Sequence, residues 1–567
     1  MLKVRYLDSA SAGVIALTAL LAGGASAQTT TAEPSLVEEV IVTGSFIAGT
    51  AKDSAIPVSV VTQAELERRG SPSVLELIKQ LPITGPVLGD TNQFSAIAQG
   101  RTGGGTINLR GLGAQRTLVL MNGRRFTGYG SDTNLLPVAA IGRVEVLKDG
   151  AAATYGSDAI GGVANFITRT NFDGLELQAD YRYVPGSDNG DYSASALYGW
   201  RGETSNLLVS LAWQHRSELS AVKRSWVRPD YPVNPSGWST FGNPGGFTIR
   251  GGPGGTGAPL GFTVDANCAA VGGFMGFTGN TPNCFWTFVA FDNLVDEEDK
   301  YQVYGEFNAD VGDSAKFHVE ALYAQTSVPD HRTSPGFVGT SGPNGPGTVN
   351  SFSVPSSNPG FNTFLTQTGN AGLIGVAQSA QATFWRALAN GGNPSTGGRG
   401  GQSNSRKYEE IRISSSLKGD TGFAGIGYDL GVTYIRELQD QQTTDILIDR
   451  LQRALNGLGG FNCTGSTPGA NGCQFLNPFS NAYPGNPALQ LTNPGLTAAN
   501  ANNVDLVRSL FDRQTFRSTQ DTFRSTRSST AGFRSACRAA RSAGRRARST
   551  ARSTSVSGFR PIPIMPG

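Results

Sequence analysis

Hydrophobic and polar residues alternate with a period of two along the middle of the chain. The first such stretch places Leu175, Leu177 and Tyr181 between charged and amide side chains. Similar stretches recur at 191–201, 207–213, 301–307, 317–323, 411–417 and 426–434. Side chains of a β-strand point alternately to its two faces, so a strand between an apolar and a polar environment has this period. We therefore predict seven strands of about ten residues each.

The connections between these strands alternate in length. Short connections at 202–205, 311–315 and 419–424 alternate with long ones at 217–299 and 329–406. Membrane β-barrels have short turns on one side and long loops on the other. Residues 171–512 are therefore predicted to form an antiparallel transmembrane β-barrel segment with long extracellular loops, which is incomplete because it holds only about seven strands.

The sequence before residue 171 has a mixed pattern. Extended runs are predicted at 56–62, 106–113, 117–125 and 144–148. A helical pattern at 63–81 is interrupted at Gly70–Pro72, and Asn122–Gly123 has the chemistry of a hairpin turn. Residues 51–170 are thus predicted to form a compact α+β domain.

The first 27 residues have the features of a cleaved signal peptide. Lys3 and Arg5 precede an apolar run at 12–22, and Ala25–Ala27 supplies a small-residue cleavage site. The apolar run is shorter than the roughly 20 residues that span a bilayer as a helix. The mature protein is therefore expected to be exported.

Composition separates the C-terminal tail from the rest of the chain. With 75 Gly and only 16% charged residues, the sequence is typical of many strands joined by polar loops. Residues 1–512 carry a net charge of −8, whereas 513–567 carry +11, almost entirely from Arg among Ser and Thr. This tail shows no period of two and contains Cys537, so we predict a disordered, aberrant C-terminus from truncation or a frame shift. A basic arm for nucleic acid or lipid is the alternative, and no nucleic-acid partner is expected.

The other four cysteines are expected to form two disulfides in an oxidising compartment. Cys268 is predicted to pair with Cys284, and Cys463 with Cys473, because each pair lies within one stretch rich in Gly and Asn. Zinc is the competing hypothesis. The chain has no C-x-x-C motif and only three widely separated histidines, so neither a metal nor a cofactor is predicted.

Several motifs in the first 170 residues occur in a recognisable order. They are EEVIVTGS from Glu38, IPVSVVT from Ile56, INLRGLG from Ile107, RTLVLMNGRR from Arg116 and RVEVLKDGAAATYGSDAIGGVANFIT from Arg143. This order resembles the plug domain of TonB-dependent outer-membrane receptors, from the energy-coupling segment to the end of the plug. The resemblance implies that 28–50 form the TonB-box segment and linker, and that the plug covers 51–170.

The resemblance also implies roles for individual residues. The segment that pairs with a TonB-type periplasmic energy transducer would be Glu38, Glu39, Val40, Ile41, Val42, Thr43 and Gly44. The residues expected to shape or gate the plug are Arg110, Gly111, Gly113, Asn122, Gly123, Arg124, Arg125, Glu145, Lys148, Gly150, Tyr155 and Gly156. The four charged residues Arg110, Arg124, Arg125 and Glu145 are expected to form ion pairs within the plug or from plug to wall.

The resemblance implies that the protein imports a scarce solute across a Gram-negative outer membrane. The protein would lie in contact with the lipid of that membrane. The solute would belong to the siderophore, cobalamin or oligosaccharide class. No catalytic residue is predicted, and the protein is not expected to be an enzyme. The alternatives are a surface-binding or adhesion protein, a signal-transducing receptor, and a truncated receptor that does not function.

Overall fold

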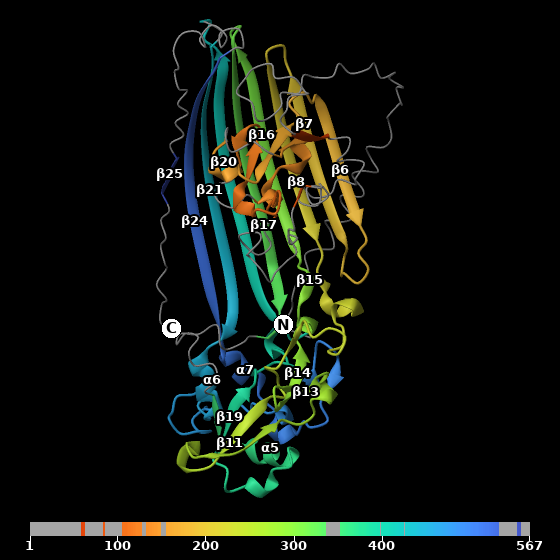
Figure 1. The fold of residues 1–567 in the computed structure, drawn as a ribbon, viewed down its shortest axis with the longest axis vertical. Helices are drawn as coiled ribbons and strands as arrows, with labels where there is room; N and C mark the ends of the chain where they lie inside the picture. The colour runs from red at the N-terminus through yellow and green to blue at the C-terminus, as the bar shows by residue number, and fades with distance from the viewer. Residues whose placement is uncertain are drawn as a thin grey trace. The chain divides into compact units, whose positions relative to one another are not determined.

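The computed structural model describes residues 58–62, 83–84, 105–126, 132–148, 155–335, 352–396, 399–423, 426–531 and 553–556. The chain divides into two compact units, 1–42 and 43–567, and every described residue lies in the second. Within that unit, a small mixed sheet is followed by a large antiparallel sheet (Figure 1). The predicted order of a mixed domain followed by antiparallel strands is confirmed.

The first domain, called here the plug after the resemblance of its motifs, contains a five-stranded sheet in the order β1-β4-β5-β2-β3. Its strands are β1 (Val58–Thr62), β2 (Thr117–Met121), β3 (Arg124–Arg125), β4 (Ile141–Leu147) and β5 (Gly162–Thr168). Only the β2–β5 pair is parallel; the other three pairings are antiparallel. All of β2 is buried and four of its five residues are apolar, because both faces of the sheet are covered there.

A two-residue hairpin joins β2 to β3, as the sequence predicts. Asn122 and Gly123 have φ angles of 50° and 77°, the left-handed values that a type I′ turn requires at both central positions. Asn tolerates this conformation and Gly adopts it without steric cost. Gly156, which precedes a short turn of 3-10 helix at Ser157–Ala159, has φ of 89°. The hairpin places the side chain of Asn122 at the edge of the plug.

The large sheet contains nine strands in the order β25-β24-β21-β20-β17-β16-β8-β7-β6 (Figure 1). They are β6 (Gly174–Arg182), β7 (Asp191–Arg201), β8 (Ser205–Arg216), β16 (Glu298–Val311), β17 (Ala315–Thr333), β20 (Gln402–Asp420), β21 (Ile426–Ile446), β24 (Phe511–Ala531) and β25 (Ser553–Val556). All adjacent pairs are antiparallel. The first seven are the predicted strands, and the predicted alternation of short and long connections is present.

The two faces of the large sheet differ. On one face, called here the plug face, Leu208, Tyr304 and Leu322 are buried and join the core of the plug. On the opposite face, called the outward face, Leu211 and Val303 lie side by side and each is about half exposed. This difference has the period of two seen in the sequence, because adjacent residues of a strand point to opposite faces.

The structure corrects the prediction of disorder for the first part of the Arg-rich tail. Strand β24 pairs with β21 along its whole length, from Phe511 opposite Ile446 to Ala531 opposite Ile426. Backbone N–H and C=O groups form this ladder, so it requires no apolar alternation. An isolated polar segment has no such partners, whereas the edge of a long strand supplies them. The prediction was therefore wrong for this strand and for β25, which continues the sheet beyond it.

The outward face of β24 is nevertheless unlike that of its neighbours. Arg517 pairs with Asp440 of β21, and the Tyr434 hydroxyl donates to Asp521 at 2.7 Å. Arg436 lies 3.7 Å from the same aspartate. On the outward face, charged side chains of β24 thus pair with charged or polar side chains of β21. Strands nearer the middle of the sheet carry apolar side chains on this face.

Three long insertions between strands fold together into one body, called here the insertion cluster. They are residues 217–297, the described parts of 334–401, and 447–510. Phe247, Phe364 and Phe479 come one from each insertion; Phe479 stacks on Phe364 with ring centroids 4.1 Å apart and contacts Phe247 at 5.2 Å. The sequence predicts irregular loops here, because Gly, Pro and Asn dominate their composition. Aromatic residues spaced far apart along the chain supply the core instead.

The insertion cluster contains small sheets and short helices. A four-stranded sheet has the order β12-β11-β19-β18, and a three-stranded one the order β10-β14-β13. The elements are β9 (Leu219–Ser220), β10 (Trp238–Ser239), β11 (Gly246–Arg250), β12 (Pro259–Val264), β13 (Phe274–Thr278), β14 (Thr281–Thr287), β15 (Asn293–Val295), β18 (Ser353–Pro355), β19 (Ser379–Phe384), β22 (Gly485–Asn486), β23 (Leu491–Thr492), α5 (Phe361–Gln367), α6 (Ile448–Leu455) and α7 (Val504–Ser509). Helix α7 begins after Asn503, whose side chain accepts a hydrogen bond from the Asp505 N–H and so caps the helix.

Both expected disulfides are formed in the insertion cluster. Cys268 is bonded to Cys284, and Cys463 to Cys473. Each bond closes a short segment within a single insertion, so the disulfides stabilise local folds, while the aromatic core joins the insertions to each other.

Some sequence predictions fall outside the described residues. They are the signal peptide at 1–27, the segment Glu38–Gly44, the helical pattern at 63–81, Gly150, and Cys537 with most of the remaining tail. In the part of the chain that the structure describes, no helix combines the length and apolar character needed to cross a membrane.

Replacing Phe479 by Ala is expected to loosen all three insertions together. The side chain is fully buried between two other insertions, and deleting a buried Phe typically costs about 3–5 kcal/mol. Hydrogen exchange should increase in 217–297 and 447–510 alike, while β16 and β17 keep their protection. Phe461→Ala is the control, since Phe461 lies in the same insertion with 69% of its surface exposed. Increased exchange in 447–510 alone would contradict a shared core.

Candidate functional site

The first group of predicted plug residues holds the plug's own segments together. Arg110, Gly111 and Gly113 form an irregular turn with φ angles of 56°, 70° and 100°. The Arg110 guanidinium donates to the backbone carbonyls of Ile160, at 3.0 Å, and Lys148, at 3.5 Å. These contacts connect the turn to the residue that follows β4 and to the segment just before β5.

A second group is also internal to the plug. Arg125 donates to the Asp158 carboxylate at 2.5 Å and to the Tyr155 carbonyl at 3.1 Å. Glu145 is buried and accepts a hydrogen bond of 2.8 Å from the Arg143 guanidinium. Burial, with a smaller contribution from Glu145, raises the pKa of Tyr155 to about 12. The phenol therefore stays neutral at physiological pH.

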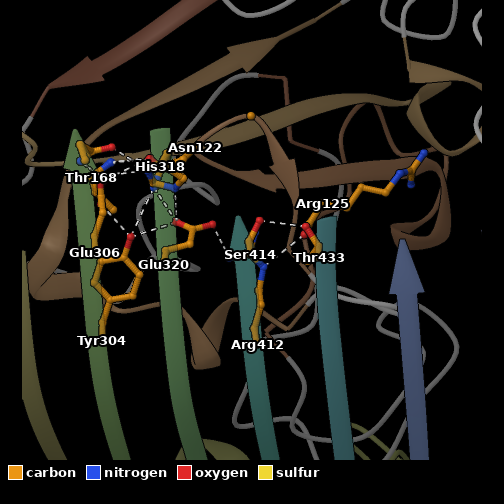
Figure 2. Close-up of polar contacts among 12 residues, drawn as sticks. Asn122, Arg125, Thr168, Tyr304, Glu306, His318, Glu320, Arg412, Ser414 and Thr433 are labelled. Carbon is orange, nitrogen blue, oxygen red and sulfur yellow. Dashed lines mark hydrogen bonds and ion pairs between the residues drawn. The ribbon is translucent and has the colours of Figure 1, made fainter. Parts of the chain in front are cut away.

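Asn122 is the point where the plug meets the large sheet (Figure 2). Its amide nitrogen donates to the Glu320 carboxylate at 2.8 Å and to the Tyr304 hydroxyl at 3.3 Å. Its amide oxygen accepts from the backbone N–H and the hydroxyl of Thr168, each at 3.1 Å. The same Thr168 hydroxyl, which has one proton for the two acceptors, also contacts the Glu306 carboxylate. The tip of the β2–β3 hairpin is thus bonded both to the plug and to the wall.

On the large sheet, called here the wall, the residues of this contact form a buried cluster of ionisable side chains. Glu306 and Glu320 are direct cross-strand neighbours on β16 and β17, and the Tyr304 hydroxyl lies 2.7 Å from one and 3.0 Å from the other. His318 lies 3.6 Å from Glu306 and 3.4 Å from Glu320. Arg412 of β20 forms an ion pair with Glu320, and neither side chain is exposed. We call these five residues and Asn122 the plug–wall network.

Arg412 also connects the network to the plug backbone. Its Nε donates to the carbonyl of Arg125 at 3.3 Å (Figure 2). Next to it, the hydroxyls of Ser414 and Thr433 lie 2.9 Å apart and join β20 to β21. The polar layer therefore crosses four adjacent strands beneath the hairpin.

Two further contacts hold the plug at other heights along the strands. Arg124, next to the hairpin turn, forms an ion pair with Asp429 near the start of β21 and donates to the Thr526 hydroxyl of β24 at 3.1 Å. On the other side, Asn134 accepts from Lys300 at 3.1 Å and, through its carbonyl, from Gln302 at 3.0 Å. Of the four charged residues expected to form ion pairs, Arg124 reaches the wall, while Arg125 and Glu145 pair inside the plug.

The residues of the wall were not among the sequence-predicted sites. Their signal is present in the sequence, since the strand at 301–307 carries Gln302, Tyr304 and Glu306 between its apolar residues. The strand at 317–323 carries His318 and Glu320 in the same way. Such positions belong to the polar face of the alternation, but the alternation alone does not say which of them meet the plug.

A buried carboxylate joins two parts of the insertion cluster. Asp265 accepts from the backbone N–H of Ser480 at 2.6 Å and from its hydroxyl at 3.0 Å. Burial raises the pKa of Asp265 to about 6, and the hydrogen bonds from Ser480 oppose this shift. Burial likewise raises the pKa of Asp292 to about 7, against a hydrogen bond from Ser334.

Comparison with known proteins assigns the first domain. The family model "TonB-dependent Receptor Plug Domain" matches residues 50–163. This part of the chain is a TonB-dependent receptor plug domain. The resemblance seen in the plug motifs from Ile56 onward is therefore confirmed, while the role of Glu38–Gly44 stays a prediction.

The chain also resembles other proteins over part of their length. Vitamin B12 transporter BtuB from Photobacterium profundum is 29% identical over 202 residues, which are 35% of this chain and 31% of the relative. The siderophore receptor PirA from Acinetobacter baumannii has a TM-score of 0.37 and 13% identity, over 83% of this chain and 45% of that one. The ferric citrate transporter FecA has a TM-score of 0.36 and 11% identity, over 84% and 54%. The chain spans about a third of the length of the curated relative it matches.

Removing Arg412 is expected to destabilise the protein strongly. In Arg412→Met, Glu320 stays buried without its guanidinium partner, and breaking a buried pair in this way typically costs about 3–5 kcal/mol. The double variant Arg412→Met/Glu320→Gln should recover most of this loss in urea unfolding of the purified protein. Lys316→Met is the control, because Lys316 and Asp310 form an exposed pair 3.9 Å apart, and no change is expected. If the double variant is less stable than the single one, the charge on Glu320 is not the cause.

The insertion cluster is expected to lose stability as pH rises from about 4 to 6. A folded-state pKa of about 6, above the ordinary 3.8, means that the folded cluster binds the proton of Asp265 more tightly than the unfolded chain. In Asp265→Asn, the part of the pH dependence between pH 4 and 6, roughly 3 kcal/mol at most, should disappear. The amide oxygen of Asn can still accept from Ser480. Fluorescence of the buried Trp286 and Trp385 during urea unfolding measures the effect, and an unchanged pH profile would contradict it.

Proposed function

We propose that this chain acts as an outer-membrane receptor that imports a scarce solute with energy supplied by a TonB-type transducer. The proposal rests on the way the plug is fastened to the sheet. Asn122, Arg124 and Asn134 all hold it through hydrogen bonds and ion pairs. Water can replace such contacts one at a time, whereas separating an apolar interface exposes its whole area. These polar contacts, which lie beside the apolar packing of Leu208 and Leu322 against the plug core, can therefore be exchanged for water when the plug is displaced and can form again when it returns.

In this proposal the large sheet is part of a barrel wall in the outer membrane, with its outward face against lipid. The plug enters from the periplasm, so β6 runs outward and the insertion cluster lies at the cell surface. The solute binds there and on the nearby plug surface around Asn134. It belongs to the siderophore, cobalamin or oligosaccharide class, and the match to a vitamin B12 transporter supports the second of these. No bond in the solute is broken, so the receptor needs no catalytic residue and no cofactor.

The segment Glu38–Gly44 couples this movement to the transducer. Its β-branched residues favour an extended strand, which pairs with an exposed sheet edge of the transducer through backbone hydrogen bonds. A pull on this strand is transmitted to the plug, and the contacts of Asn122 with Glu320 and Tyr304 are among those it must break.

Breaking the backbone ladder of this segment is expected to abolish energised uptake. Ile41→Pro removes one N–H donor, while Ile41→Ala keeps it and serves as the matched control. Cells expressing each form are supplied with radiolabelled cyanocobalamin, ferric enterobactin or ferric citrate. Uptake should fall to the level of cells without the protein for Ile41→Pro only, with surface binding unchanged in both variants.

Two other results would reject the proposal. Binding without energised uptake by the unaltered chain would indicate a surface-binding protein. Equal uptake by both variants would show that the segment is not the coupling strand.

A further inference from the structure

Strand register brings three metal-ligating side chains together at one end of the large sheet. His215 of β8 lies directly opposite Asp299 of β16, with its Nδ1 3.0 Å from the carboxylate. Glu297 lies immediately before the first residue of β16. One ligand atom from each of the three residues lies within 4.8 Å of the others. Residues 217–297 of the insertion cluster begin and end at this point.

The other two histidines of the chain differ from His215 in their charge balance. His331 contacts Asp296, but Arg406 lies 3.3 Å from the same carboxylate oxygen. His318 lies between two glutamates, one of which pairs with Arg412. In both places a guanidinium already supplies positive charge.

At His215 the third ionisable group, after the imidazole and the Asp299 carboxylate, is the carboxylate of Glu297. The nearby cations Arg216 and Lys300 both pair at 2.9 Å with Glu298, whose side chain is buried on the plug face. Asp299 belongs to the alternate position of the strand and points the other way, and the Glu297 carboxylate lies with it beside His215. The outward group of one imidazole and two carboxylates thus carries excess negative charge.

The imidazole is held in place from the side. The ring of Tyr192 stacks on it with centroids 4.6 Å apart and an angle of 20° between the planes, and Trp213 packs edge-on against Tyr192. His215 has only 8% of its surface exposed, while 25% of the surface of the Asp299 side chain is exposed. An ion can therefore approach from solvent past the partly exposed Asp299 carboxylate and reach the His215 imidazole, whose orientation is already fixed.

The geometry points to a divalent metal site formed by an imidazole nitrogen of His215 and one carboxylate oxygen each of Glu297 and Asp299, suited to zinc. Mixed nitrogen and oxygen ligands favour zinc, whereas calcium and magnesium favour oxygen alone. Ligands at the usual zinc distances of about 2.0–2.2 Å lie roughly 3.4 Å apart, so small side-chain movements complete the site. Water would take the fourth position. The bound ion would join the end of β8 to the start of β16 and thereby clamp the base of the first insertion.

The site goes beyond the proposed transport function and does not depend on it. It also departs from the prediction that the chain holds no metal. That prediction rested on sequence spacing, and spacing does not show that β8 and β16 place residues 84 positions apart side by side.

Zinc binding to the purified full chain tests this site. The protein, carrying Cys537→Ser to remove a competing thiol, is stripped with EDTA and dialysed against ZnCl2. One Zn2+ per chain should bind, and His215→Gln and Glu297→Gln should each weaken binding at least tenfold. His331→Gln, the matched control at a second His–Asp pair, should bind as the parent does. Tryptophan fluorescence confirms that each variant is folded.

Cobalt(II) gives an independent readout. Bound to the parent, it should show the intense visible absorption of a four-coordinate site, and this absorption should disappear in His215→Gln. Bound zinc should also slow proteolysis within 217–297 in the parent only. The proposal is overturned if the parent binds no zinc, or if His215→Gln binds zinc and cobalt as the parent does.

Discussion

The continuous antiparallel ladder from β6 to β24 is the constraint on which the rest of the structure depends. Each strand is paired with its neighbours through backbone groups, so the register sets which side chains meet across strands and which face each one occupies. Shifting a strand by one residue would exchange its two faces. If β16 were shifted in this way, Tyr304 and Glu306 would leave the plug, and Val303 would enter its core. The register therefore determines which side chains of the sheet contact the plug and which lie on the outward face.

The ladder creates a buried polar layer beneath the plug. Glu306 and Glu320 are brought side by side by the β16–β17 pairing, and Arg412 and Asn122 supply the donors that make their burial tolerable. The same layer is what fastens the plug. Its contacts are directional, so they hold the plug in one orientation.

The insertions follow a different principle. Two disulfides close short segments. The ring of Phe479 stacks on Phe364 and contacts Phe247, and these contacts join insertions that are far apart in the sequence. Because the insertions leave from neighbouring strand ends, the ladder also brings them close enough to share a core. At the base of the first insertion, the same effect places His215 beside Asp299.

The sequence by itself determined the elements whose signals are local. The period of two identified seven strands, Asn122–Gly123 identified a hairpin, and cysteine spacing identified both disulfides, because neighbouring residues carry each of these signals. Motif order identified the plug. Only the tertiary structure decided the pairing of β24, whose ladder needs no side-chain pattern, and the shared core of the Gly-rich insertions. It also decided the polar layer around Glu320, because cross-strand neighbours are separated by many residues and no local pattern records which of them meet.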